Sequence, residues 1–168
     1  MSPDVRAFFA TKKSRMNPYF STLLLLAVAG SSLAQETPSL GIRGGLANGL
    51  TVKWFLVEDT EAIEGIVTLR QTAATSTLAI TGLYELHNYD FASADLRWYY
   101  GAGAHIALGS NANGESQTGL GIDAIIGIEY RIKGGPISVG ADWKPGLAVI
   151  GSGGLVGDEG AISLRYQL

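Results

Sequence analysis

The sequence predicts an all-β fold in which eight antiparallel strands, each beside its neighbour in the chain, close into an up-and-down barrel. Three observations lead to this prediction. Apolar and polar residues alternate over many short segments, and a period of two is typical of strands. Turns rich in glycine, asparagine and serine separate the segments, and the 168 residues include 23 glycines but only 5 prolines. No amphipathic helix of useful length interrupts the pattern.

The first 34 residues have the pattern of a secretory signal peptide. A basic stretch with Lys12, Lys13 and Arg15 precedes a short apolar run, 23–30, and small residues follow at Ser32 and Ala34. The apolar run is too short for the roughly 20 residues of a spanning helix. Cleavage is expected after residue 34, which leaves 35–168 as the barrel domain. Met16 is a possible true start, because the residues after it already form a complete signal.

The first half of the mature chain contains four candidate strands, 40–46, 50–57, 63–71 and 77–87. In the first, Leu40 and Ile42 lie on one face and Arg43 on the other. An Asn-Gly pair at 48–49 favours a tight hairpin turn, because both residues tolerate a positive φ. The third and fourth strands are expected to turn at 72–75.

The second half contains four more candidate strands, 95–108, 122–132, 137–144 and 161–168. The clearest alternation runs from Ile122, where isoleucines at even positions oppose Asp123, Glu129 and Arg131. A polar loop, 110–117, is expected before this strand. A glycine-rich loop, 151–160, is expected before the last strand.

The polar faces of the strands carry nearly balanced charge. Arginine outnumbers lysine among the bases, and its planar guanidinium pairs with a carboxylate at two points, which suits buried ion pairs. These residues are therefore expected to form a polar network inside the barrel. Its predicted members are Arg43, Lys53, Glu64, Arg70, Glu85, His87, Asp95, Arg97, His105, Asp123, Glu129, Arg131, Asp142, Lys144 and Arg165.

The opposite faces are apolar and carry most of the aromatic residues near strand ends. Aromatic residues at such positions are typical of the interfacial girdles of membrane barrels. Eight strands close without an unpaired edge, as hydrocarbon requires. The fold is therefore expected to be transmembrane. The predicted lipid-facing aromatics are Trp54, Tyr84, Trp98, Tyr100, Tyr130, Trp143 and Tyr166.

The last eight residues, AISLRYQL, alternate and place Tyr166 two positions before the terminal Leu168. This ending resembles that of outer-membrane β-barrel proteins, although that family usually ends in Phe or Trp. The segments GLYELHN, WYYGAGAHIALG, GIDAIIGIEYRI and ADWKPG also resemble small outer-membrane barrels of Gram-negative, Bacteroidetes-like bacteria. The resemblance implies an outer-membrane location, outer-membrane lipids as surroundings, and assembly by the barrel-assembly machinery through the final strand. It implies no chemistry.

Few residues point to catalysis or to a cofactor. His87, His105, Asp95, Asp123, Ser138 and Ser163 are the available pieces of a hydrolase triad, but sequence spacing cannot show that they meet. Two histidines are weak evidence for a metal site, and the glycine-rich segments open no helix that would cradle phosphate. No cofactor and no metal is expected. A net charge of −3 makes nucleic acid an unexpected partner.

An eight-stranded barrel is about wide enough for its own side chains, so the lumen is expected to be closed by ion pairs. The expected role is structural or surface interaction, with periplasmic termini and with the loops 110–117 and 151–160 outside the cell. Three alternatives remain at this point: a narrow porin-like channel for small solutes, a lipid-modifying enzyme of the outer membrane, and a soluble periplasmic, lipocalin-like barrel with its apolar face inward.

Overall fold

The computed structural model describes residues 37–46, 48–57, 59–71, 75–89, 95–111, 116–151, 154–156 and 160–168. The predicted signal peptide, 1–34, and the possible start at Met16 lie outside these residues. The strands are β1 (Ser39–Gly45), β2 (Asn48–Val57), β3 (Glu61–Gln71), β4 (Thr75–Asn88), β5 (Leu96–Asn111), β6 (Ser116–Arg131), β7 (Ile137–Trp143), β8 (Gly146–Ile150), β9 (Gly154–Val156) and β10 (Gly160–Gln167).

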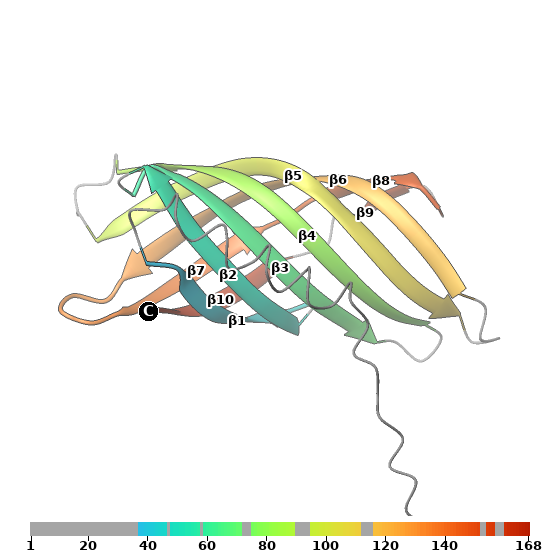
Figure 1. Cartoon of the computed structure of the whole chain (residues 1–168), viewed down its shortest axis with the longest axis horizontal. Coiled ribbons are helices and arrows are strands. Elements are labelled where there is room, and N and C mark those ends of the chain that lie inside the picture. The colour runs from blue at the N-terminus through green and yellow to red at the C-terminus, as the bar shows by residue number, and fades with distance from the viewer. Residues whose placement is uncertain are drawn as a thin grey trace, which may run out of the picture. The chain divides into compact units, whose positions relative to one another are not determined.

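The strands form one closed antiparallel barrel (Figure 1). Each strand from β1 to β6 pairs with the next, β6 pairs with both β7 and β8, and β10 pairs with β7 and with β1. β7 and β8 are two parts of the seventh barrel strand, interrupted at Pro145, whose missing N–H cannot join the ladder. β9 and β10 supply the eighth. The predicted eight-stranded, all-β, antiparallel barrel is confirmed.

Some strands are longer than the sequence suggested. β5 continues to Asn111 and β6 begins at Ser116, so the predicted loop 110–117 is strand at both ends, and only 112–115 lie outside the described residues. β8, and β9 inside the predicted loop 151–160, were not expected at all. Residues 145–150 were assigned to no element, and the glycines of 151–160 suggested a loop, yet the backbone groups of β8 and β9 pair with neighbouring strands. Asn48 and Gly49, predicted to form a turn with residue 47, begin β2 instead, and Thr75 begins β4; 47 and 72–74 lie outside the described residues.

Both ends of the barrel domain lie at the same rim, which we call the terminal rim. Ser39 at the start of β1 is the antiparallel partner of Gln167 at the end of β10. The turns after β2, β4 and β6 lie at this rim as well, whereas the β1–β2, β3–β4 and β5–β6 hairpins turn at the opposite end, the far rim (Figure 1).

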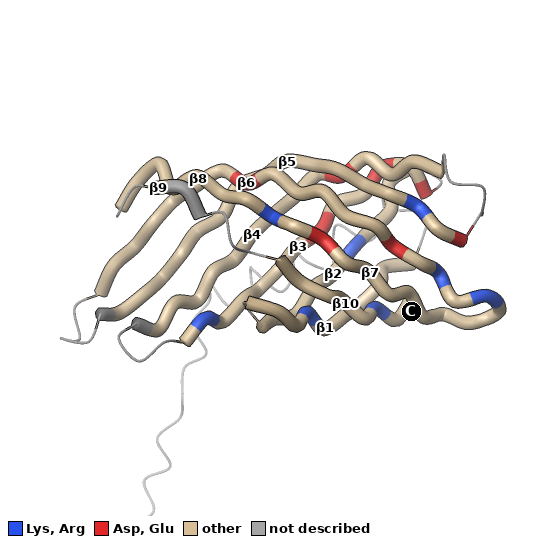
Figure 2. Tube along the Cα trace, turned by 180° about the vertical axis from the view of Figure 1, so that it is seen from behind, with Lys and Arg blue, Asp and Glu red and all other residues tan. Residues whose placement is uncertain are grey.

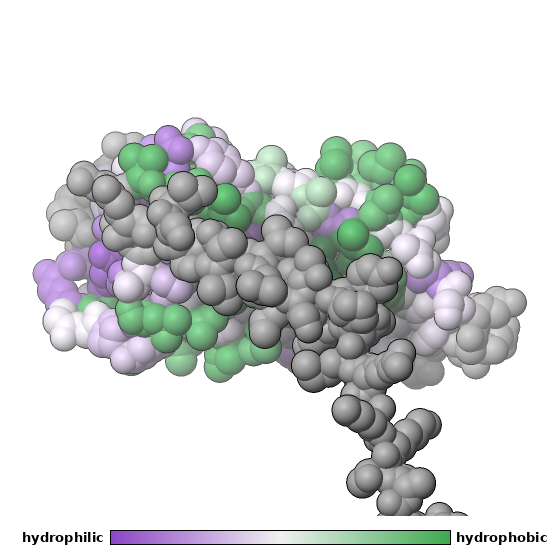
Figure 3. All heavy atoms as spheres, in the orientation of Figure 1, coloured by the Kyte–Doolittle hydropathy of each residue, from purple (hydrophilic) through white to green (hydrophobic). Residues whose placement is uncertain are grey.

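The alternating polar and apolar residues of each strand face the lumen and the exterior of the barrel, respectively. Inward side chains such as Lys53, Glu64 and Arg165 are no more than 1% exposed, whereas outward Ile42 and Ile162 are 60% and 64% exposed. Figure 3 shows patches of apolar side chains on the parts of the wall that are in view. Among the described residues, no helix has the length and apolar character needed to cross a membrane. The exterior is therefore apolar and the lumen polar, the reverse of a soluble protein.

Close approach of strands inside the barrel requires glycine at position 103. A Cβ built on Gly103 would lie 1.8 Å from the carbonyl oxygen of Gly82 and 2.9 Å from the Cα of Leu83, and these backbone atoms cannot move aside cheaply. We expect Gly103→Ala to destabilise the barrel by about 1–3 kcal/mol, as overpacking does. This loss of unfolding free energy is measured by urea titration in detergent, in which the folded fraction is read from the heat-modifiable band on a gel.

Gly82→Ala is the matched control, because a Cβ at Gly82 would meet no atom within 4 Å. Its urea midpoint should equal that of the parent chain. Equal midpoints for both variants would show that β4 and β5 do not approach as described.

Candidate functional site

Lys53 is the centre of a buried group of charges in the half of the lumen nearer the terminal rim. Its ammonium nitrogen lies 2.8 Å from Glu85 Oε2, 3.3 Å from Glu64 Oε2 and 3.9 Å from Glu129 Oε2. It also lies 4.3 Å from the centroid of the Tyr99 ring. A cation in contact with several carboxylates and an aromatic face is stabilised by both, which is the condition for keeping a lysine inside.

Two arginines connect Glu64 and Glu129 to further strands, and a third arginine pairs with a fourth carboxylate, Asp142. Arg165 Nη2 lies 2.6 Å from Glu64 Oε1, and its Nη1 lies 3.6 Å from Glu129 Oε1. Arg97 donates from Nε and Nη2 to Glu129 Oε2, at 3.2 and 3.0 Å. Arg43 pairs with Asp142 at two points, one of them 2.8 Å long, and this is the bidentate geometry that favours arginine over lysine.

We name these eight side chains the Lys53 cluster: Arg43, Lys53, Glu64, Glu85, Arg97, Glu129, Asp142 and Arg165. All eight are buried. Four cations face four carboxylates, so the cluster has no formal excess charge. Most charged positions of the barrel lie in the half that holds the C-terminus, whereas the far ends of β4 to β6 carry few (Figure 2).

Aromatic residues fill the remaining space around the cluster. His87 stacks on Tyr99 with ring centroids 4.9 Å apart, and Phe55 meets the edge of His87 at 5.0 Å. His87 Nε2 lies 3.1 Å from Glu85 Oε2, and the Tyr99 hydroxyl donates to Asp142 Oδ2 at 3.0 Å. The lumen at this level is therefore filled by side chains from most of the barrel strands.

A second ionic group lies at the terminal rim around Asp59, in the turn between β2 and β3. Asp59 adopts a φ of 61°, in the left-handed region that Asp tolerates better than most residues. Its carboxylate accepts hydrogen bonds from Arg131 Nη2 at 2.6 Å and from Arg97 Nη1 at 3.1 Å. Burial raises the pKa of Asp59, but the Arg131 hydrogen bond and the positive charges of Arg97 and Arg131 lower it by a larger amount. The pKa of Asp59 therefore lies below its ordinary value.

Lys133 and Asp95 form an outer pair at this rim. Lys133 Nζ lies 3.0 Å from Asp95 Oδ2, and the lysine side chain is 75% exposed. The hydrogen bond and the negative charge of Asp95 raise the pKa of Lys133. An exposed pair of this kind stabilises a fold very little.

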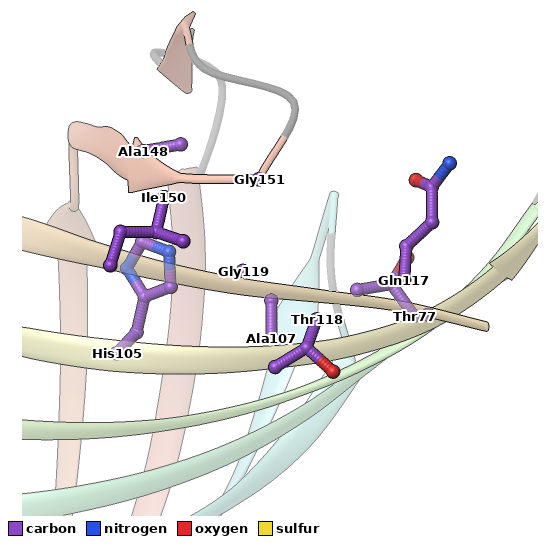
Figure 4. A pocket seen from close by; sticks show the side chains of 10 residues that line it. Thr77, His105, Ala107, Gln117, Thr118, Gly119, Ala148, Ile150 and Gly151 are labelled. Carbon is purple, nitrogen blue, oxygen red and sulfur yellow. The ribbon is translucent and has the colours of Figure 1, made fainter.

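The far half of the lumen is open. A cavity of about 550 Å³, which we call the vestibule, is lined by Thr77, His105, Ala107, Gly109, Gln117, Thr118, Gly119, Ala148, Ile150 and Gly151 (Figure 4). A smaller cavity of about 160 Å³ adjoins it deeper in the barrel and shares Thr77, His105 and Ala107. The vestibule exists because its walls carry small residues at inward positions, where the other half carries arginine and glutamate.

His105, Asp123 and Lys144 form the floor between the vestibule and the Lys53 cluster. His105 Nδ1 lies 2.9 Å from both carboxylate oxygens of Asp123, and Lys144 Nζ lies 3.6 Å from Asp123 Oδ1. Arg70, half-buried on β3, borders the smaller cavity. The carboxylate holds the imidazole through Nδ1, so Nε2 is the ring nitrogen left for any further contact.

The structure brings together only two of the six possible triad residues, His105 and Asp123. Ser138 donates to Glu129 at 2.7 Å, Ser163 accepts from Arg43 at 3.4 Å, and Asp95 pairs with Lys133. Both serine hydroxyls thus have partners other than an imidazole. Among the described residues, no three His, Asp or Glu side chains are placed to hold a metal ion.

The seven aromatics predicted to face lipid project from the outside of the barrel. Tyr84, Tyr100, Tyr130, Trp143 and Tyr166 are 43–52% exposed, while Trp54 and Trp98 are half-buried. Trp98 is covered partly by Tyr100, whose ring centroid lies 5.4 Å away. Trp54, Trp98, Tyr130 and Tyr166 all lie within three residues of a strand end at the terminal rim. The far half of the exterior has no equivalent: 101–111 and 116–129 contain no aromatic residue.

Several residues of the lumen escaped the sequence analysis. Asp59 was missed because it lies in a turn, outside any alternating strand. The Thr51 hydroxyl donates to Glu64, and Phe55 and Tyr99 pack against the cluster. Alternation alone could have found these three, since each occupies an inward position.

A closed eight-stranded antiparallel barrel with a charged lumen and an apolar wall has the architecture of outer-membrane β-barrel proteins. The solved structure of Neisserial surface protein A, an outer-membrane barrel, is similar to this chain, with a TM-score of 0.54. The two sequences are 12% identical, and the likeness covers 78% of this chain and 93% of that one. At this identity the likeness shows the fold alone. No family model and no curated protein matches the chain.

Replacing Lys53 should unbalance the Lys53 cluster. Lys53→Met leaves Glu85, Glu64 and Glu129 with excess buried negative charge, and we expect a loss of roughly 3–5 kcal/mol in unfolding free energy. Adding Glu85→Gln should recover part of the loss. Urea titration in detergent, monitored by the folded band, compares the variants.

Lys133→Met is the control, because its ion pair is exposed, and its urea midpoint should not change measurably. The assignment of Lys53 as the centre of the cluster would be refuted if Lys53→Met and Lys133→Met had the same midpoint.

Stability should depend on Asp59 only above the low pKa of this residue in the folded barrel. A carboxylate with a depressed folded pKa stabilises the fold at a pH above its ordinary value of 3.8 and loses this contribution as the pH falls through the folded pKa. We therefore expect Asp59→Asn to lower the melting temperature at pH 7. The difference from the parent chain should shrink as the pH is lowered below 3.8. A difference that is constant from pH 7 to pH 2 would contradict the ionic role of Asp59.

Proposed function

We propose that the chain is an outer-membrane β-barrel protein with a structural or surface-interaction role, whose lumen is closed by the Lys53 cluster. The burial of that cluster carries the proposal. Arg165, Glu64 and Lys53 have no exposed side-chain surface, although they project from β10, β3 and β2 into the same space. A continuous aqueous path would have to pass these side chains and would leave them partly exposed. The support is therefore for a closed barrel rather than a channel.

The apolar wall supports the membrane location. Outward residues along the barrel are exposed and apolar, including Leu50, Ile80, Ile122 and Leu164. Water around such a wall would expose far more apolar surface than a soluble protein tolerates, whereas hydrocarbon solvates it. The lipocalin-like alternative requires the opposite arrangement, with the apolar face inward.

The barrel is proposed to have its terminal rim in the periplasm and its vestibule toward the cell exterior. The outward aromatics near the terminal rim support this orientation, because aromatic residues favour a membrane interface. The C-terminal strand β10 (Gly160–Gln167) is the proposed contact with the assembly machinery, and outer-membrane lipids surround the wall.

A charged residue on the outer wall should destabilise the folded barrel more strongly the closer it lies to the centre of the bilayer. Ile126 lies within β6 and is 51% exposed outward, while Ile132 lies just beyond the end of β6 and is 42% exposed. In a membrane we expect Ile126→Arg to cost about 2–4 kcal/mol and Ile132→Arg about 0–1 kcal/mol. The folded fraction in phospholipid vesicles, scored by heat-modifiable gel migration, measures both. Equal tolerance of the two variants would favour the soluble barrel.

The closed lumen predicts no conductance. Purified protein in planar bilayers should give no discrete current steps, because the Lys53 cluster fills the lumen between the vestibule and the terminal rim. Replacing Lys53, Glu64, Glu129 and Arg165 together by alanine keeps the formal charge balanced and removes most of this barrier, so steps should then appear. Steps from the parent chain would overturn the closed barrel and favour the channel.

A further inference from the structure

The wall of the barrel is much lower at the β1–β2 hairpin than elsewhere. β1 has 7 residues, whereas β5 and β6 have 16 each. At a rise of about 3.3 Å per residue and a tilt of about 40°, β1 spans about 18 Å of the barrel axis and β5 about 40 Å. Figure 1 shows the β1–β2 hairpin ending well short of the β5–β6 hairpin. Since all strands begin near the terminal rim, the difference lies at the far end.

The strands on either side of this hairpin have unpaired edges above it. Among the described residues, the ladder between β2 and β3 ends at Leu69, whereas the ladder between β3 and β4 continues to Gln71. On the other side, β9 pairs with β8 and, among the described residues, with no second strand. The far half of the wall therefore has a notch between β3 and β9, with the β1–β2 hairpin as its lower edge.

The tip of the hairpin has the composition of a segment immersed in hydrocarbon. No charged residue occurs from Gly44 to Val52, and Leu46 and Leu50 at the tip are 63% and 62% exposed. The apolar band of an outer-membrane barrel is about 25 Å tall. A hairpin that spans about 18 Å from the terminal rim ends inside that band, so the notch opens onto lipid rather than onto water.

The vestibule lies behind the notch. Its walls come from β4, β5, β6 and β8, and no residue of β1 or β2 closes it. None of its ten lining residues carries a fixed charge, and Ala107, Ala148 and Ile150 present apolar surface. Its volume of about 550 Å³ is in the range of sites that hold small ligands.

We propose that the vestibule is entered from the side, over the β1–β2 hairpin, by an acyl chain of a lipid in the outer leaflet. The inference rests on the membrane location given under Proposed function. The acyl chain lies against Ala107, Ala148 and Ile150, and the His105–Asp123 pair marks the innermost point that the acyl chain reaches. A lipid is the occupant because hydrocarbon is what surrounds the notch at this depth, and because the wall offers methyl and glycine surface rather than fixed charge.

Photolabelling tests the proposal. The full protein is folded into phosphatidylcholine vesicles that contain a phosphatidylcholine with a diazirine at the middle of one acyl chain. After illumination, adducts are mapped by peptide mass spectrometry along β5, where inward Ala107 lies between outward Ile106 and Leu108. We expect adducts on inward Ala107 as well as on outward Ile106 and Leu108.

A side chain that fills the vestibule should exclude the acyl chain. Ala107→Phe places a ring in the cavity and should reduce inward adducts about tenfold, because the space is then taken by the side chain. Ala104→Phe on the same strand points outward and should leave them unchanged. Both variants are checked by heat-modifiable migration. If Ala107→Phe fails to fold, the labelling of the parent chain alone decides.

Adducts confined to Ile106 and Leu108 would overturn the proposal and indicate a water-filled vestibule, while the membrane location would stand. Absence of adducts from both faces would mean that the wall does not contact hydrocarbon. The proposed function would then fail, and the lateral site with it.

Discussion

The contacts of Lys53 with three carboxylates are the interaction on which the rest of the barrel depends. A barrel with an apolar exterior must put its polar side chains inside, and every inward charge must then meet an opposite one. Lys53, Arg165, Arg97 and Arg43 meet this condition with Glu64, Glu85, Glu129 and Asp142, which project from strands around the whole barrel. The Lys53–Glu85, Arg165–Glu64 and Arg43–Asp142 pairs thus join strands that no backbone hydrogen bond connects. Together with the Arg97–Glu129 pair they occupy the terminal half of the lumen.

The far half follows a different constraint. Alanine and glycine replace arginine and glutamate at most inward positions of β5, β6 and β8 that line the vestibule, so the same barrel diameter leaves a cavity there. The division into a filled half and an empty half therefore comes from side-chain size alone, on a continuous backbone. Pro145 falls near this boundary, where the seventh strand changes partner from β10 to β9.

The sequence was sufficient for the strand count and for the assignment of faces. Alternation around Ile122, for example, puts Asp123 and Glu129 on one side whatever the neighbours are. It could not supply the pairs themselves. Arg43 and Asp142 are 99 residues apart, and their contact depends on the register and stagger of all the strands between them. The sequence also could not predict the vestibule, because a glycine-rich stretch such as 116–121 has the composition of a loop but is paired as a strand in the structure.

The one-sided distribution of aromatic residues affects how the barrel adapts to bilayer thickness. In the membrane proposed above, the four outward aromatics near the terminal rim would hold this rim at one interface, because the far half of the wall carries no comparable aromatic residue. A thicker or thinner bilayer then shifts the opposite interface along the wall, while the terminal rim stays in place. A mismatch between bilayer thickness and wall height has its largest effect at the β1–β2 hairpin, where the wall is lowest. Membrane thickness therefore sets how deeply that side of the barrel is immersed.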